Sequence, residues 1–274
     1  MMTRQRVDEL LTQQEYFSTQ EEAARAILAG EVFINDAAHR KVLKPGEQLS
    51  DATTFDVKTI KQYVSRGGEK LKGALSAFHY DLSSKNVVDA GASTGGFTDC
   101  ALQEGAAHVS AIDVGYGQLA WKLRNDQRVS VYERMNIREA DAGAVGGPFD
   151  VAVADLSFIP LDRVLPALIE LVNQRGDLII LVKPQFEAAQ SEIGHKGVVS
   201  GQSTHSRILA DVLKDFARYG LTVCDVTFSP IKGPEGNIEF WIYASRQQAE
   251  TSIFPHQYEE CAARVVAQAY EVLG

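Results

Sequence analysis

The stretch from Val87 to Phe97 constrains the fold more than any other part of this chain, because an apolar run there leads into a glycine-rich turn. Val87 and Val88 fit a short buried strand. The glycines at 91, 95 and 96 carry no Cβ, so the backbone can turn tightly and approach a ligand closely. Apolar residues then recur at helical spacing. A strand, a glycine turn and a helix N-terminus together predict a pocket for a nucleotide-like ligand.

The spacing of these glycines narrows the choice of ligand. Ser93 stands where the dinucleotide fingerprint needs its second glycine, and no Gly-Lys-Ser/Thr of a P-loop follows. A second apolar run ends in Asp113, 22 residues after Gly91, where a carboxylate would hold the hydroxyls of a ribose. S-adenosylmethionine has a ribose and no phosphate, so it fits this turn; a glycine turn in another α/β protein is the alternative. The residues predicted to bind this cofactor are Gly91, Ser93, Thr94, Gly95, Gly96, Phe97, Asp113, Asn136 and Asp155.

Composition limits the class of protein. The chain has 274 residues, 45% of them hydrophobic and 23% charged, which suffices for one large domain and a small one. The apolar runs have only strand length, the N-terminus lacks the apolar core of a signal peptide, and the three cysteines are far apart. We therefore expect a cytoplasmic protein with no membrane partner and no metal site. A net charge of −9 implies that any RNA site is a local basic patch.

Strand and helix patterns alternate from residue 85 to the end of the chain. Strands are predicted at Val87–Asp89, His108–Asp113, Val129–Tyr132, Val151–Asp155, Leu178–Lys183, Leu221–Phe228 and Ile238–Ala244. Helices are predicted at Thr98–Glu104, Gln118–Asn125, Asp162–Asn173 and Ser203–Tyr219, with a packing helix at Tyr258–Leu273. This alternation predicts an α/β domain over 85–274, Rossmann-like, with a mostly parallel seven-stranded sheet and helices on both faces.

Residues 1–60 form a separate pattern of two helices followed by short strands, which predicts a small α+β module. Arg6–Leu11, Ala29–Asn35 and Lys44–Gly46 within it resemble the S4-type RNA-binding domain. The module has seven Lys and Arg against ten Asp and Glu, a balance that disfavours binding to phosphates. The candidate RNA contacts, with solvated surface charges as the alternative, are Arg6, Arg25, Arg40 and Lys41.

Residues 61–84 are predicted to be a basic linker and hinge helix, which begins after Ser65 and runs to about Phe78. Arg66 and Lys72 in this segment are further candidate RNA contacts. Lys196 lies in a glycine-flanked loop, Gly194–Val199, which we interpret as a mobile lid or an RNA contact, with an inert surface loop as the alternative.

Polar side chains end three of the predicted strands. Asp155 and Lys183 follow buried runs, and Glu239 begins one. Burial favours the neutral form of a lysine, and a neutral amine can act as a general base. Asp155 and Glu239 would orient Lys183, and Lys70 from the hinge helix would favour the neutral form by like-charge repulsion. The alternative is a set of buried ion pairs.

Lys70, Asp155, Lys183 and Glu239 resemble the catalytic tetrad of the FtsJ-like ribose 2′-O-methyltransferases. Wider motifs resemble the TlyA family, whose members join an S4-type domain to an FtsJ-like domain. The motifs are Ser65–Leu71, Asp113–Leu119, Leu123–Asp126, Asp155–Ile159 and Lys183–Glu187. This resemblance implies 2′-O-methylation of cytidine in ribosomal RNA, with S-adenosylmethionine as donor, ribosomal RNA or subunits as partner and Lys183 as general base.

Other functions are less consistent with the sequence. A non-catalytic RNA- or ribosome-binding protein would not need an intact tetrad and glycine turn. A membrane-lytic protein, which the family's historical haemolysin label suggests, would need a span or a long basic amphipathic helix. A base N-methyltransferase would have two prolines after the fourth strand, and Asp155–Phe158 has none.

Overall fold

The computed structural model describes residues 4–17, 19–58, 62–248 and 252–274 and divides into two compact units, Met1–Gln62 and Tyr63–Gly274. The predicted boundary at residues 60 and 61 falls outside the described residues. The predicted linker is not a separate segment, because residues 63–84 belong to the second unit. Its helix α3 (Arg66–Phe78) packs along α4 (Gly96–Gln103) through the buried side chains of Leu71 and Leu75.

The described residues of the first unit form two helices and two small antiparallel ladders. The helices are α1 (Val7–Gln13) and α2 (Gln20–Ala29); β1 (Arg4–Arg6) pairs with β3 (Gln48–Ser50), and β2 (Val32–Ile34) pairs with β4 (Phe55–Val57). The Thr19 hydroxyl caps α2 by accepting a hydrogen bond from the amide of Glu22, and Gly30 ends that helix at φ +75°. The first unit thus has the helices and short strands that the sequence predicts for a small α+β module.

The second unit is built on one seven-stranded sheet. Its strands are β5 (Asn86–Ala90), β6 (His108–Asp113), β7 (Val129–Glu133), β8 (Phe149–Ala154), β9 (Val172–Val182), β10 (Thr222–Phe228) and β11 (Phe240–Ser245). They lie in the order β10-β11-β9-β8-β5-β6-β7, and only β11 runs antiparallel to its neighbours. The predicted α/β fold with a mostly parallel sheet is confirmed.

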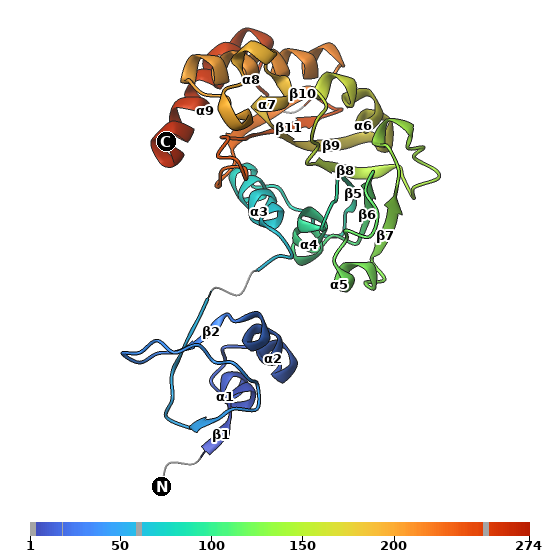
Figure 1. Ribbon diagram of the computed structural model, residues 1–274. Coiled ribbons are helices and arrows are strands. Elements are labelled where there is room, and N and C mark those ends of the chain that lie inside the picture. Colours follow the sequence, from blue (N-terminus) through green and yellow to red (C-terminus); the bar gives the residue numbers. More distant parts are fainter. Residues whose placement is uncertain (1–3, 18, 59–61, 249–251) are drawn as a thin grey trace. The chain divides into compact units, whose positions relative to one another are not determined.

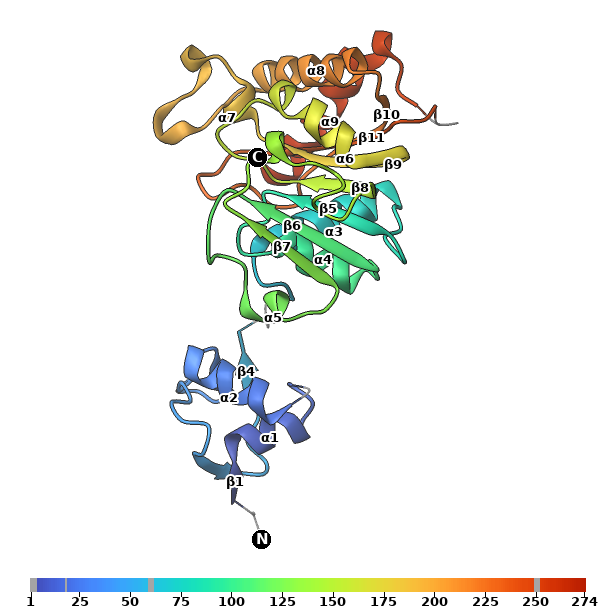
Figure 2. The same ribbon diagram turned by 90° about the vertical axis from the view of Figure 1, so that its right-hand side faces the viewer.

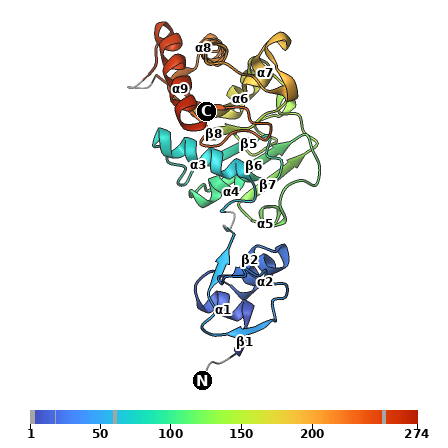
Figure 3. The ribbon, with the colours of Figure 1, turned by 60° about the vertical axis from the view of Figure 1, so that its left-hand side comes forward.

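Helices cover both faces of this sheet, as Figures 1 and 2 show. Alternate residues of each strand face opposite ways. Because helices cover both faces, both sets of residues are mostly apolar and buried. Val87, Val153 and Trp241 pack toward α3, α4 and α5 (Trp121–Arg124), whereas Val88 and Ile242 pack toward the opposite helices. Those opposite helices are α6 (Leu165–Leu171), α8 (Gln202–Arg218) and α9 (Tyr258–Leu273), and α9 lies beside α8 (Figure 3).

Two helix predictions were wrong in extent. The helix expected at Gln118–Asn125 is reduced to α5, because the chain before it turns through Gly115 and Gly117, the latter at φ +71°. The helix expected at Asp162–Asn173 is a 3-10 turn η2 (Leu161–Arg163) followed by α6. The strand β9 then begins at Val172, which pairs with Phe149 of β8.

Shorter elements occupy the loops at the carboxyl ends of the strands. They are α7 (Pro184–Glu187), η1 (Ile137–Glu139), η3 (Gln190–Glu192) and η4 (His195–Gly197); η5 (Pro255–Gln257) precedes α9. The strand order reverses between β5 and β8, because β6 and β7 follow on one side of β5 and β8 and β9 on the other, and ligands of open α/β sheets bind at such a reversal. Within the described part of the chain, no helix has the length and apolar character that crossing a membrane requires.

Candidate active site

The glycine turn after β5 leaves no space for a side chain at position 91. Gly91 has φ +86°, and a Cβ on it would lie 2.7 Å from the carbonyl oxygen of Asp155. The amides of Gly91 and Ala92 both donate to the carbonyl of Ile112, which ties the turn to the end of β6. The backbone of β5 is therefore held directly against the end of β8, and only glycine fits at position 91.

Asp113 ends β6 and organises the next loop. Its carboxylate accepts hydrogen bonds from the amide of Ser93 at 2.8 Å and from the amide of Gly115 at 2.6 Å. An ionised carboxylate has about four acceptor positions, so Asp113 retains capacity for hydroxyl donors.

A pocket of about 420 Å³ opens between these turns and the loops after β7 and β8. Five of the nine residues predicted to bind a cofactor line it: Gly91, Ser93, Asp113, Asn136 and Asp155. The other four, Thr94, Gly95, Gly96 and Phe97, are not part of its lining. Phe97 instead packs under the sheet against Trp241, with ring centroids 5.3 Å apart, because the first turn of α4 directs it toward α3.

Sequence reasoning missed much of the pocket wall. Met135, Arg138, Leu156, Ser157 and Ile159 also line the pocket. All of them lie in loops at the carboxyl ends of β7 and β8. That position is the one feature of the sequence that could have identified them as pocket residues. The side chain of Asn136 accepts a hydrogen bond from the amide of Arg138 at 3.1 Å and so begins η1.

The four residues of the predicted tetrad form two ion pairs at the pocket's edge. Lys183 Nζ pairs with Asp155 Oδ1 and donates to Ser157 Oγ at 2.9 Å. Lys70 Nζ lies 2.6 Å from Glu239 Oε2, and these two side chains are only 7% and 1% exposed. The register of β9 and β11 places Phe240 opposite Val182, so Lys183 and Glu239 extend from adjacent strand ends.

The tetrad carboxylates influence each other. Burial raises the pKa of Glu239, Lys70 and Lys183 lower it, and the negative charge of Asp155 raises it. Sequence reasoning placed Lys70 as a like charge acting on Lys183, whereas the structure pairs Lys70 with Glu239. The arrangement therefore consists of one buried ion pair, Lys70–Glu239, and a more exposed pair in which Lys183 binds Asp155 of the pocket lining.

A second buried carboxyl lies beneath the glycine turn. Asp89 on β5 is fully buried, and its Oδ2 accepts a hydrogen bond from the hydroxyl of Thr98 at 2.6 Å. Burial raises the pKa of Asp89 to about 7, opposed by the Thr98 hydrogen bond and assisted by the charges of Asp155 and Asp113.

Phe158 presents an aromatic ring beside the pocket. It has φ +65° and is 90% exposed, and its ring lies 5.1 Å from that of Phe186 between centroids. A left-handed backbone conformation is costly for a phenylalanine, so the surrounding loop holds this residue under strain.

The candidate RNA contacts are mostly engaged in ion pairs. In the first unit, Arg6 pairs with Asp8, Arg25 with Glu21 and Arg40 with Glu47, while Lys41 packs over Gly30. In the second unit, Arg66 donates to the carbonyl of Lys232, and Lys72 pairs with Glu104 at 2.8 Å. Pairing of this kind at a surface is weak and leaves these cations available to phosphates.

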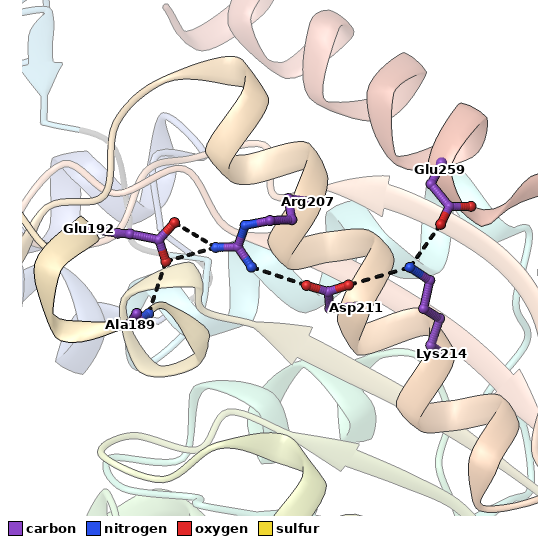
Figure 4. Close-up of polar contacts among 6 residues, drawn as sticks. All are labelled: Ala189, Glu192, Arg207, Asp211, Lys214 and Glu259. Carbon is purple, nitrogen blue, oxygen red and sulfur yellow. Dashed lines mark hydrogen bonds and ion pairs between the residues drawn. The ribbon is translucent and has the colours of Figure 1, made fainter.

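The loop that follows the tetrad lysine is anchored at both ends. Figure 4 shows Glu192 bound to Arg207 of α8, in a chain of contacts that continues through Asp211 and Lys214 to Glu259 of α9. At the other end the buried side chain of Asn237 accepts a hydrogen bond from the amide of Val199 and donates one to the carbonyl of Gly197. Lys196 lies between these anchors at φ +64°.

Within the part of the chain that the structure describes, no three His, Cys, Asp or Glu side chains gather closely enough to hold a metal ion.

Comparison with known proteins shows close relatives over the whole chain. Residues 63–246 match the family described as FtsJ-like methyltransferase. The chain is 42% identical over 270 residues to the 16S/23S rRNA (cytidine-2′-O)-methyltransferase TlyA of Mycobacterium tuberculosis, covering 98% of this chain and 99% of that protein. It is 36% identical over 236 residues to Hemolysin A of Brachyspira hyodysenteriae, covering 86% and 97%. A solved structure from Streptococcus thermophilus that carries a hemolysin name is 41% identical, with a TM-score of 0.72, covering 99% of this chain and 97% of that chain.

Proposed function

From the premise that this chain belongs to the FtsJ-like methyltransferase family, within it to the TlyA branch, we propose that it methylates the ribose 2′-hydroxyl of a cytidine in ribosomal RNA. One observation carries the proposal. Asp155 lines the nucleotide pocket and also pairs with Lys183, so a proton acceptor lies beside the place where a methyl donor binds.

The pocket fits S-adenosylmethionine. Its volume lies within the range of roughly 300–1,000 Å³ that small-molecule sites have, and the Gly91 turn is a cradle that a Cβ would fill. We assign Gly91, Ser93, Asp113 and Asn136 to cofactor contacts, and the segment 94–97 to shaping the turn. The bound cofactor supplies a methyl group on a positively charged sulfur.

Lys183 acts as the general base in this account. Its amine would accept the proton of the ribose 2′-hydroxyl as the oxygen–methyl bond forms and the methyl–sulfur bond breaks, so that the cofactor would leave as a neutral thioether. Asp155 holds the amine in place. The neighbouring ion pair of Lys70 and Glu239 interacts electrostatically with Asp155 and Lys183. General-base catalysis contributes about 10²–10⁴-fold, and alignment of the reacting atoms can contribute roughly 7–11 kcal/mol. Positioning is therefore the larger part of the catalysis.

The basic side chains of both units and the exposed ring of Phe158 are consistent with an RNA substrate. The first unit is proposed to be an S4-type domain that contacts RNA through Arg6, Arg25, Arg40 and Lys41, and Arg66, Lys72 and Lys196 are proposed contacts in the second unit. The exposed ring of Phe158 can stack on a base, which stabilises single-stranded nucleotides by about 1–3 kcal/mol. Ribosomal RNA and assembled subunits are substrates that a protein would meet in the cytoplasm, which is where the sequence predicts this protein to be.

Transfer of radiolabelled methyl from S-adenosylmethionine to unmodified ribosomal RNA, and to subunits, tests the proposal. We expect label in RNA with the wild-type protein and none with Lys183→Ala, whose cofactor affinity stays close to wild type. Cofactor binding without transfer to any RNA or subunit would favour a non-catalytic RNA-binding protein. Release of dye from lipid vesicles would favour the lytic alternative.

A further inference from the structure

Two sequence motifs, residues 155–159 and residues 183–187, meet side by side at the pocket's edge. Asp155 pairs with Lys183, the ring of Phe158 packs on that of Phe186, and the carboxylate of Glu187 accepts a hydrogen bond from the amide of Leu161 at 2.9 Å. The loop after β8 is thus fixed along α7. Two uncharged groups also contact the lysine amine: the ring of Phe186, whose centroid lies 5.9 Å from Lys183 Nζ, and the hydroxyl of Ser157, which accepts a hydrogen bond from it.

Ser157 Oγ accepts a hydrogen bond from Lys183 Nζ at 2.9 Å. The same nitrogen pairs with Asp155 Oδ1, and the two acceptors stand two residues apart on one loop. Ser157 lines the pocket as well, and its residue is exposed on that side. The hydroxyl therefore contacts the amine from the pocket lining.

The number of protons on the amine determines what this hydrogen bond does. A lysine amine that acts as a base is neutral, with two N–H donors and one lone pair in a tetrahedral arrangement. Two acceptors, Asp155 Oδ1 and Ser157 Oγ, occupy the two donors. With Asp155 alone the amine could rotate about the Cε–Nζ bond among staggered positions, and the lone pair would point away from the substrate part of the time.

We propose that Ser157 is a positioning residue that holds the Lys183 amine in the one rotamer whose lone pair faces the ribose 2′-hydroxyl. This inference rests on the proposed function, because it concerns the base of that reaction. It assigns a role to a residue that is neither charged nor part of the tetrad.

The test compares Ser157→Ala and Ser157→Thr with the wild type and with Ser206→Ala. Ser206 is a matched control, because its hydroxyl only donates to the carbonyl of Gln202 within α8. For Ser157→Ala we expect kcat to fall on the order of 10- to 100-fold, as when a reacting group is misplaced by about an ångström. The KM for S-adenosylmethionine should change little, Ser157→Thr should restore most of kcat, and Ser206→Ala should match the wild type.

The pH–rate profile separates orientation from proton affinity. If Ser157 orients the lone pair, the loss in Ser157→Ala is as large at pH 9 as at pH 7. A loss that disappears at pH 9 would overturn the inference, as would an alanine variant with wild-type kcat or a threonine variant as impaired as alanine. If the wild type transfers no methyl to RNA, the proposed function fails; if only the difference between variants is missing, the role of Ser157 fails.

Discussion

Asp89 makes the stability of the second unit depend on pH. Its carboxyl is fully buried on β5, and its pKa is raised from 3.8 to about 7. Because the folded state binds this proton more tightly than the unfolded state, the group's contribution to stability is complete below pH 4. It decreases as the pH rises and is lost above pH 7.

The size of this effect follows from the difference between the two pKa values. About three units at about 1.4 kcal/mol each amount to about 4 kcal/mol as an upper limit, which is large beside the roughly 5–15 kcal/mol that stabilise a typical domain. Asp89→Asn keeps an acceptor for the hydroxyl of Thr98 and removes the charge. We expect its free energy of unfolding to exceed that of the wild type by an amount that grows by about 3 kcal/mol from pH 5 to pH 8.

Urea unfolding followed by tryptophan fluorescence measures this difference. Both tryptophans, Trp121 and Trp241, lie in the second unit, so the signal reports that unit alone. Glu187, whose pKa burial raises to about 7, titrates in the same range, but it does so in both proteins and cancels. Asp141→Asn, at an exposed aspartate of the same unit, controls for the change in net charge. Parallel curves for the wild type and Asp89→Asn between pH 5 and 8 would refute the reasoning.

Three further substitutions probe the pocket. Gly91→Ala should weaken S-adenosylmethionine binding by roughly tenfold or more, since a strained φ costs about 1–3 kcal/mol and the new Cβ meets the backbone of Asp155; calorimetry with unchanged affinity would contradict this. Phe158→Ala should raise the KM for RNA more than the KM for S-adenosylmethionine, and equal changes would argue against stacking on a base. Glu187→Leu leaves the amide of Leu161 without its acceptor, so it should lower the free energy of unfolding by about 1–3 kcal/mol and also lower kcat, while Glu187→Gln should retain both.

The fold could be predicted because its strands are short apolar runs separated by clear turn signals. The carboxyl-end rule then directed attention to Asp113, Asp155 and Lys183; Asp113 and Asp155 line one pocket, and Lys183 pairs with Asp155. Helix extents were harder. The residues before Trp121 have helical spacing, but the tertiary requirement that Gly115 approach Asp113 replaces the expected first turns with a loop.

The contacts of the site that loops make were harder to predict from the sequence. Nothing in the glycine turn shows which face of α4 Phe97 occupies, and its packing on Trp241 depends on a strand more than a hundred residues away. Ser157 is an ordinary polar loop residue until the structure places it on Lys183. Likewise the pairing of Lys70 with Glu239 follows from the position of α3, which local patterns do not encode.

The central claim is that this protein methylates a ribose 2′-hydroxyl with Lys183 as base, and the most direct measurement locates the transferred methyl. Ribosomal RNA labelled by the wild-type protein is hydrolysed with alkali, which cleaves every linkage except one next to a 2′-O-methylated ribose. We predict label in an alkali-resistant dinucleotide and its absence with Lys183→Ala. Label in mononucleotides would place the methyl on a base, and undiminished labelling by Lys183→Ala would show that Lys183 is not the base.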